Sequence, residues 1–193
     1  MTSSGEAGTL SSRLPKLKFG FGIVAFFFIC QIVWAVQKTV HPGSSEAGGY
    51  AAALTLISAF VLAAYILHCI AAYHYALSNV EGWKHPISPR RAIRFHFIPI
   101  FNLYWNYKWP WEVARFVNWR TQRHRMSGVL VGTPVLTGVL VGALLDTSIG
   151  ALIILSSFAY ISRCLRDAFA APPLPAELHA DSGLDAAALT TDN

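Results

Sequence analysis

Four long apolar segments limit what this chain can fold into, and they run over residues 19–36, 50–77, 128–145 and 147–163. A helix of about 20 apolar residues matches the hydrocarbon thickness of a bilayer. Only 13% of the 193 residues are charged, whereas soluble domains carry about 25%. These features predict an all-α polytopic membrane protein with four transmembrane helices plus an interfacial or re-entrant amphipathic element.

The segments outside the apolar runs have a different composition. Residues 1–15 are rich in serine and glycine, and residues 172–193 are acidic and start with two prolines. We predict a flexible N-terminus, a membrane domain over 16–171 and a disordered C-terminal tail. The first apolar run follows basic residues, as in a signal peptide. It is longer than a usual signal sequence and no small-residue cleavage site follows it, so we interpret it as an uncleaved span.

The stretch 88–125 between the second and third spans is aromatic and basic, and Pro99 and Pro110 interrupt it. Each arginine or lysine costs roughly 2.5–3.5 kcal/mol at the centre of a membrane. Proline also removes a backbone donor that lipid cannot replace. We therefore predict an interfacial or shallow re-entrant element over 88–108, followed by a second surface helix over 111–125. That helix is expected to turn Val113, Phe116 and Val117 toward lipid.

Lipid headgroups are the predicted partner of this stretch. Amphipathic tryptophan rings favour the headgroup layer, and juxtamembrane arginines favour anionic lipids over nucleic acid. The predicted headgroup residues are Trp105, Trp109, Trp111, Arg115, Arg120, Arg123 and Arg125.

The distribution of basic residues predicts the topology. Residues 78–127 hold nine lysines and arginines, whereas the loop over 37–49 holds only Lys38. Basic loops stay on the cytoplasmic side. We predict a multi-pass protein of a bacterial inner membrane with both termini in the cytoplasm.

Small and polar residues inside the spans indicate helix contacts. The third span contains two GxxxG spacings, Gly128/Gly132 and Gly138/Gly142, which allow close helix packing. Gln31 lies in the middle of the first span and is expected to link helices through its amide.

Two groups of residues are candidate binding sites. Asn102, Asn106 and Glu112 are a possible polar pocket, and the alternative is that they bond backbone groups freed by the prolines. His68 is a candidate axial ligand for haem or a chlorophyll-type pigment, with His96 as a second ligand. The alternative, which we favour, is a neutral His68 bonded to a carbonyl or to Tyr65, and no cofactor.

Motifs for metal binding and catalysis are missing from the sequence. The three cysteines lack CxxC spacing, and the chain contains no glycine-rich phosphate loop, no HExxH and no paired carboxylates. We expect no metal site and no enzymatic activity.

The chain also resembles a known family. Ser88-Pro89, then the run from Phe97 to Leu103 (FIPIFNL), then Pro110 and Glu112, are similar to the signature of a bacterial four-span family catalogued only as a domain of unknown function. The resemblance implies this architecture over roughly residues 19–166 and implies no activity. The family usually has tryptophan where Phe95 or His96 stands.

Three functions remain open from the sequence. The first is a non-enzymatic accessory or scaffolding subunit that packs against a larger membrane complex. The second is a haem- or pigment-binding protein that uses His68 for redox chemistry or light harvesting. The third is a protein that handles lipids or small solutes.

Overall fold

The computed structural model describes residues 10–40 and 45–172, and this part of the chain is helical without strands. The predicted tail over 173–193 and the first nine residues of the predicted flexible N-terminus lie outside the described residues.

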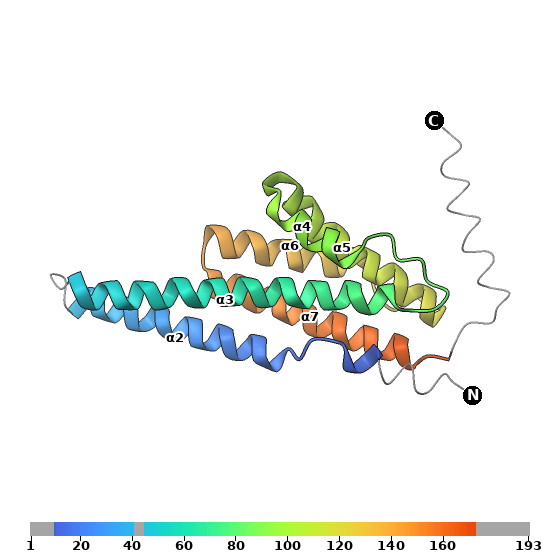
Figure 1. Ribbon diagram of the computed structural model, residues 1–193, viewed down its shortest axis with the longest axis horizontal. Coiled ribbons are helices and arrows are strands. Elements are labelled where there is room, and N and C mark those ends of the chain that lie inside the picture. The colour runs from blue at the N-terminus through green and yellow to red at the C-terminus, as the bar shows by residue number, and fades with distance from the viewer. Residues whose placement is uncertain (1–9, 41–44, 173–193) are drawn as a thin grey trace.

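Four long helices run alongside one another (Figure 1). They are α2 (Lys18–Val40), α3 (Ser45–Ser78), α6 (Gly128–Leu144) and α7 (Thr147–Ala170). Among the described residues, three helices are long and apolar enough to cross a membrane: α2, the Ala52–Ser78 part of α3, and α7. The fourth, α6, is apolar but has only 17 residues. The all-helical membrane class is therefore supported, and a fourth crossing stays a prediction.

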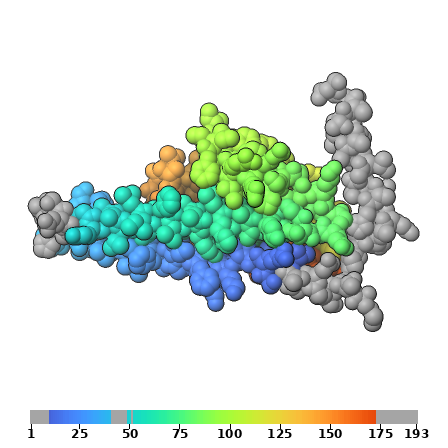
Figure 2. Space-filling model, viewed as in Figure 1, coloured from blue at the N-terminus to red at the C-terminus, as the bar shows by residue number. Residues whose placement is uncertain are grey.

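The molecule tapers because α2 and α3 extend beyond the turn between α6 and α7 (Figures 1 and 2). At this turn the Ser148 hydroxyl donates a 3.1 Å hydrogen bond to Oε1 of Gln31, which confirms that Gln31 links helices. The remaining part of α2, from Gln31 to Val40, continues for about 13 Å at 1.5 Å per residue. One end of the molecule is consequently a two-helix hairpin, and the other end is a multi-helix bundle.

The central stretch forms α4 (Pro89–Arg94), the 3₁₀ turn η1 (Phe95–Phe97) and α5 (Pro99–Thr121). The chain breaks at Ile98, which is extended because Pro99 follows it. We predicted a second break at Pro110, and this is wrong: α5 continues through Pro110 as one helix. Pro110 is buried in this helix, and α5 keeps its helical course although the proline donates no backbone hydrogen bond.

One face of α5 is buried inside the protein, and it carries Trp105, Trp109, Val113, Phe116 and Val117, each at most 1% exposed. Two predictions are therefore wrong. Trp105 and Trp109 do not reach headgroups, and the other three side chains do not face lipid. In one continuous helix these positions, three or four residues apart, form a single stripe. The stripe packs on α3 and α7.

The two glycine pairs of α6 face different helices. An added Cβ on Gly132 would lie 2.7 Å from the Tyr107 carbonyl oxygen of α5, and one on Gly128 would meet the Trp111 ring. An added Cβ on Gly138 would lie 2.8 Å from the Gly150 carbonyl oxygen of α7. Gly142 also faces Gly150, at an ordinary contact distance. Backbones approach this closely only where side chains are missing.

Candidate functional site

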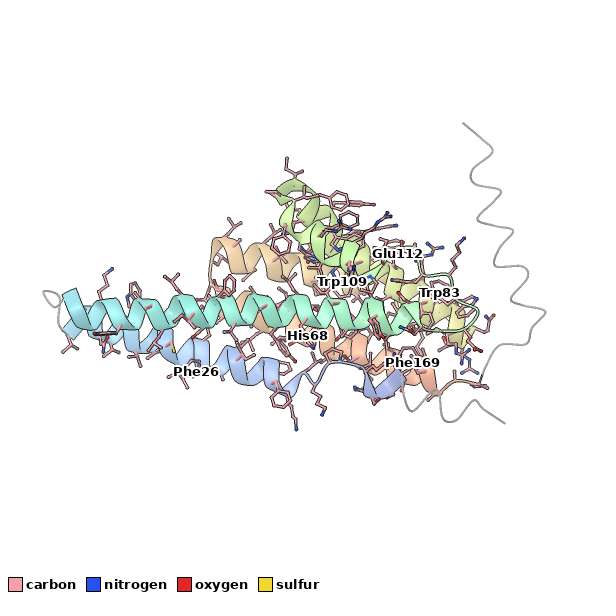
Figure 3. All side chains as sticks on the ribbon, in the orientation of Figure 1. Phe26, His68, Trp83, Trp109, Glu112 and Phe169 are labelled. Atoms are coloured by element: carbon pink, nitrogen blue, oxygen red, sulfur yellow. The ribbon has the colours of Figure 1, made fainter. Side chains whose placement is uncertain are left out.

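A cluster of buried and half-buried histidines and tryptophans lies where α5 passes over the end of α3. We call His74, His85 and His96 the histidine cluster. His74 on α3 is fully buried, and Trp105 stacks on its ring at a centroid distance of 5.8 Å. Trp109 lies on the other flank at 6.1 Å. Figure 3 shows Trp83, Trp109 and Glu112 at this end of the molecule, far from Phe26 on α2.

A tight loop after α3 brings His85 back onto His74. Gly82 in this loop has φ 73°, a left-handed conformation that glycine adopts without strain. His85 Nε2 then lies 2.7 Å from His74 Nδ1. Trp83, in the same loop, donates its indole N–H to His85 Nδ1 at 3.4 Å. The three side chains therefore form one hydrogen-bonded row.

His96 is in η1, which follows α4 directly and packs on α5, and α4 in turn packs on α3. Its Nδ1 lies 2.9 Å from the Ala92 carbonyl oxygen, so this nitrogen carries the proton. The Asn106 side chain lies beside the His96 ring. Asn106 is buried and donates to the Asn102 carbonyl oxygen at 2.9 Å. Asn102 and Asn106 thus bond each other along α5, next to the histidine cluster.

Glu112 is a buried carboxylate on α5, with a side chain only 6% exposed. It forms 3.1 Å ion pairs with Lys108, one turn before it, and with Arg115, almost one turn after it. The carboxylate also interacts with the His85 ring. A buried carboxylate needs such partners. Glu112 therefore lies between two groups: the charged side chains Lys108 and Arg115 of α5, and the histidine cluster.

Burial sets the charge of the two cluster histidines that lie outside the candidate spans. It lowers the pKa of His85 to about 4, although the nearby Glu112 carboxylate acts in the opposite direction. Burial also lowers the pKa of His96, and the contacts with Ala92 and Asn106 oppose this shift. Both rings are consequently neutral at pH 7.

These pKa values predict that acid destabilises the protein. The pKa of His85 falls from 6.5 in the unfolded chain to about 4 in the folded protein. The unfolded state therefore binds more protons between pH 6.5 and 4, and stability falls as the pH is lowered through this window. The loss from His85 alone reaches up to about 3 kcal/mol. Unfolding in mixed micelles at pH 7 and pH 4.5 measures it.

The control for this prediction is the exposed His124. We expect His85→Gln to flatten the decline between pH 7 and 4.5, whereas His124→Gln leaves the decline unchanged. His96 keeps its own contribution in both variants. An equal pH dependence in the two variants would contradict the assignment to His85.

The candidate cofactor residues do not meet. His68 is exposed on α3 and contacts Tyr65, with ring centroids 6.4 Å apart. Within the described residues no hydrogen bond or ring contact joins His68 to His96. This part of the chain also holds no group of three or more histidine, cysteine, aspartate or glutamate side chains placed to bind a metal. Haem or pigment binding at His68 stays a prediction.

Three of the four predicted headgroup arginines have partners within the protein. Arg115 pairs with Glu112, and Arg125 pairs with Asp167 of α7 at 2.7 Å. Arg120 donates to the Ala171 carbonyl oxygen at 3.3 Å. The exposed residues of the predicted set are Arg115, Arg123, Arg125 and, at 37% exposure, Trp111. Contact between these residues and lipid headgroups stays a prediction.

Sequence reasoning missed the contact between His74 and His85. The two residues are eleven positions apart, one in a span and one in a loop, and no helical or strand period relates them. The available signal was the turn at Gly82, four residues after the end of α3. Even so, a turn glycine does not say which side chains it brings together.

Comparisons with protein-family models, curated proteins and solved structures find no match for this chain. The family resemblance of the central stretch therefore stays a prediction.

Proposed function

We propose that this chain is a non-enzymatic accessory subunit of a bacterial inner-membrane complex, in which α2 and the first half of α3 bind a partner helix. One observation carries the proposal. Only 22% of the most apolar windows of α2 and α3 is buried within the chain itself. Both helices continue past the α6–α7 turn, where no other described helix covers them (Figure 1).

Two apolar grooves lie between α2 and α3 and suit a helix better than scattered lipid contacts. One groove, of about 450 Å³, passes Gly22, Phe26 and Ile57. The other, of about 370 Å³, passes Phe26, Cys30 and Gln37. Oε1 of Gln37 is buried without a hydrogen-bond partner. An amide in an apolar groove is a typical bonding point for a neighbouring membrane helix, whereas lipid tails offer no partner.

We place the inner membrane surface at the start of α2. The Tyr65 hydroxyl donates to the Lys16 carbonyl oxygen at 3.0 Å, so the basic start of α2 lies beside Tyr65. If Lys16 and Lys18 mark the inner surface, about 20 Å of α3 after Tyr65 continues toward the cytoplasm. Under this proposal the charged residues of α5 and the histidine cluster lie on the cytoplasmic side, with both termini.

The hairpin proposal is tested by filling the first groove. An added Cβ on Gly22 meets nothing within 4 Å, so Gly22→Leu blocks the groove without a clash inside the chain. We expect wild-type protein from gently extracted membranes to run in native mass spectrometry with a partner subunit. Gly22→Leu should lose at least 90% of that partner, because the leucine occupies the space of the partner's side chains.

The matched control is Ala25→Leu on the same helix, since Ala25 is exposed and lies outside both grooves. This variant should keep its partner at the wild-type level. The proposal fails if wild-type protein runs as a monomer, or if both leucine variants retain the partner equally.

A further inference from the structure

A pocket of about 550 Å³ lies where the chain enters α2. Its walls come from the segment before α2 and from α7, which are far apart in the sequence and lie side by side in the molecule (Figure 1). Pockets that bind small molecules in proteins have volumes of about 300–1,000 Å³. The pocket is therefore large enough for a small organic group as well as for a single ion.

Three basic side chains line this pocket: Lys16, Lys18 and Arg166. All three are exposed, and within residues 10–40 and 45–172 none of them forms an ion pair. Asp167, the neighbour of Arg166, pairs with Arg125 instead. Among the described residues no carboxylate lines the pocket. Because three like charges around one pocket repel one another, an anion placed between them would be stabilised.

The start of α2 adds to this positive potential. The helix begins at Lys18 and contains no acidic residue in its first turn. The N-terminus of a helix carries a partial positive charge and N–H groups without intrahelical partners. Since Leu17 and Lys18 both line the pocket, the helix end and the three basic side chains favour a negative charge at the same place.

Contacts with α3 hold the wall before α2 in position. Leu14 of this wall is buried, with an exposure of 7%. The Tyr65 hydroxyl donates a 3.0 Å hydrogen bond to the Lys16 carbonyl oxygen. The guanidinium group of Arg13 lies over the Tyr75 ring, 5.4 Å from its centroid. The backbone that carries Lys16 is thus packed against the helices, and the pocket is a built feature of the fold.

We propose that Lys16, Lys18 and Arg166 bind a phosphate group in this pocket. A guanidinium group donates two parallel hydrogen bonds to phosphate oxygens, and lysine binds phosphate as a point charge. A carboxylate fits less well, because it offers only two oxygens to three cations. Two sources carry the required group: the headgroup of an anionic lipid, and inorganic phosphate from solution.

This site is distinct from the groove that we propose for the partner helix, although Lys18 lies at the end of both. The groove continues between α2 and α3, whereas the pocket lies against α7. A bound phosphate would therefore lie at one end of the partner interface and outside it. The two proposals can consequently fail independently of each other.

Native mass spectrometry of the purified protein in a neutral detergent tests the site, with phosphatidylglycerol as the probe. We expect the wild-type protein to retain one phosphatidylglycerol molecule at low lipid concentration. Lys16→Gln and Arg166→Gln should each weaken this binding about fivefold, the effect of one basic side chain near an anionic lipid. This pattern assigns the phosphate to a lipid headgroup. If inorganic phosphate alone binds, measured by calorimetry with the same dependence on both residues, the site takes phosphate from solution.

The matched control is Arg163→Gln, because Arg163 is exposed on α7 and lies outside the pocket. This variant should bind as the wild type does. Gly22→Leu should also keep the phosphate site when it loses the partner subunit, which separates this proposal from the proposed function. The proposal is overturned if neither phosphatidylglycerol nor inorganic phosphate binds, or if the three glutamine variants bind equally. All three substituted side chains are exposed, so the fold should be kept, and circular dichroism checks it.

Discussion

Substituting Gly150 by alanine is expected to destabilise the protein by about 3 kcal/mol, the upper end of typical overpacking costs. The added Cβ would meet the carbonyl oxygen of Gly138 and the backbone of Gly142 at distances that real Cβ atoms do not show. Backbone atoms of two packed helices do not move aside as a flexible side chain does. Reversible unfolding by dodecyl sulfate in mixed micelles measures the difference in free energy of unfolding.

The matched control is alanine at Gly142, on the opposing helix of the same contact. Its Cβ would lie 3.7 Å from the nearest heavy atom, the Gly150 Cα, which is ordinary contact. In a helix interior alanine is also better than glycine by up to about 1 kcal/mol. Gly142→Ala should therefore be neutral or slightly stabilising. Similar costs for the two alanines would argue against a close α6–α7 crossing at Gly150.

Replacing Trp109 by alanine is expected to cost about 3–5 kcal/mol, the usual range for a large buried aromatic side chain. Trp109 is fully buried, stacks on Tyr73 at 6.1 Å and meets Phe158 edge-on at 5.6 Å. Its removal leaves a cavity among three helices, α3, α5 and α7. The same dodecyl sulfate titration provides the measurement.

The control for this prediction is Trp111→Ala, which removes an exposed tryptophan from the same helix. Trp111 is two positions further along α5 and 37% exposed, so its loss should cost about 1 kcal/mol. A tryptophan in the headgroup layer contributes to membrane position more than to helix packing. Equal and small costs at both positions would restore the headgroup interpretation of Trp109 and remove the buried face of α5.

The lengths of the apolar runs predicted the long helices well. In lipid a chain must form all its backbone hydrogen bonds within itself, and an apolar run has few ways to do this other than a helix. Pro110 predicted a break that α5 does not have, since a proline usually ends or kinks a helix. Packing on both sides of Pro110 overrides that tendency, and a single sequence does not reveal it. The location of the tryptophans could not be predicted for a similar reason, because an indole ring suits a headgroup layer and a protein core about equally well.

The candidate site was less predictable than the fold. Asn106 and Glu112 were recognised as polar positions near the prolines, but their partners were not. Glu112 pairs with Lys108 and Arg115, which are four residues before it and three after it. These spacings predict ion pairs only if α5 is one continuous helix. The bond between His74 and His85 depends on a loop closing back on a helix end. Such contacts arise from tertiary structure and have no local period.

The taper from bundle to hairpin has a consequence for the shape of the surrounding bilayer. A body that is wide at one membrane face and two helices thin at the other displaces unequal areas of lipid in the two leaflets (Figure 2). Molecules of this form relieve packing stress where the leaflet around the wide end is convex. Under the proposed topology the wide end lies at the inner leaflet, so the chain should favour membrane that is convex toward the cytoplasm.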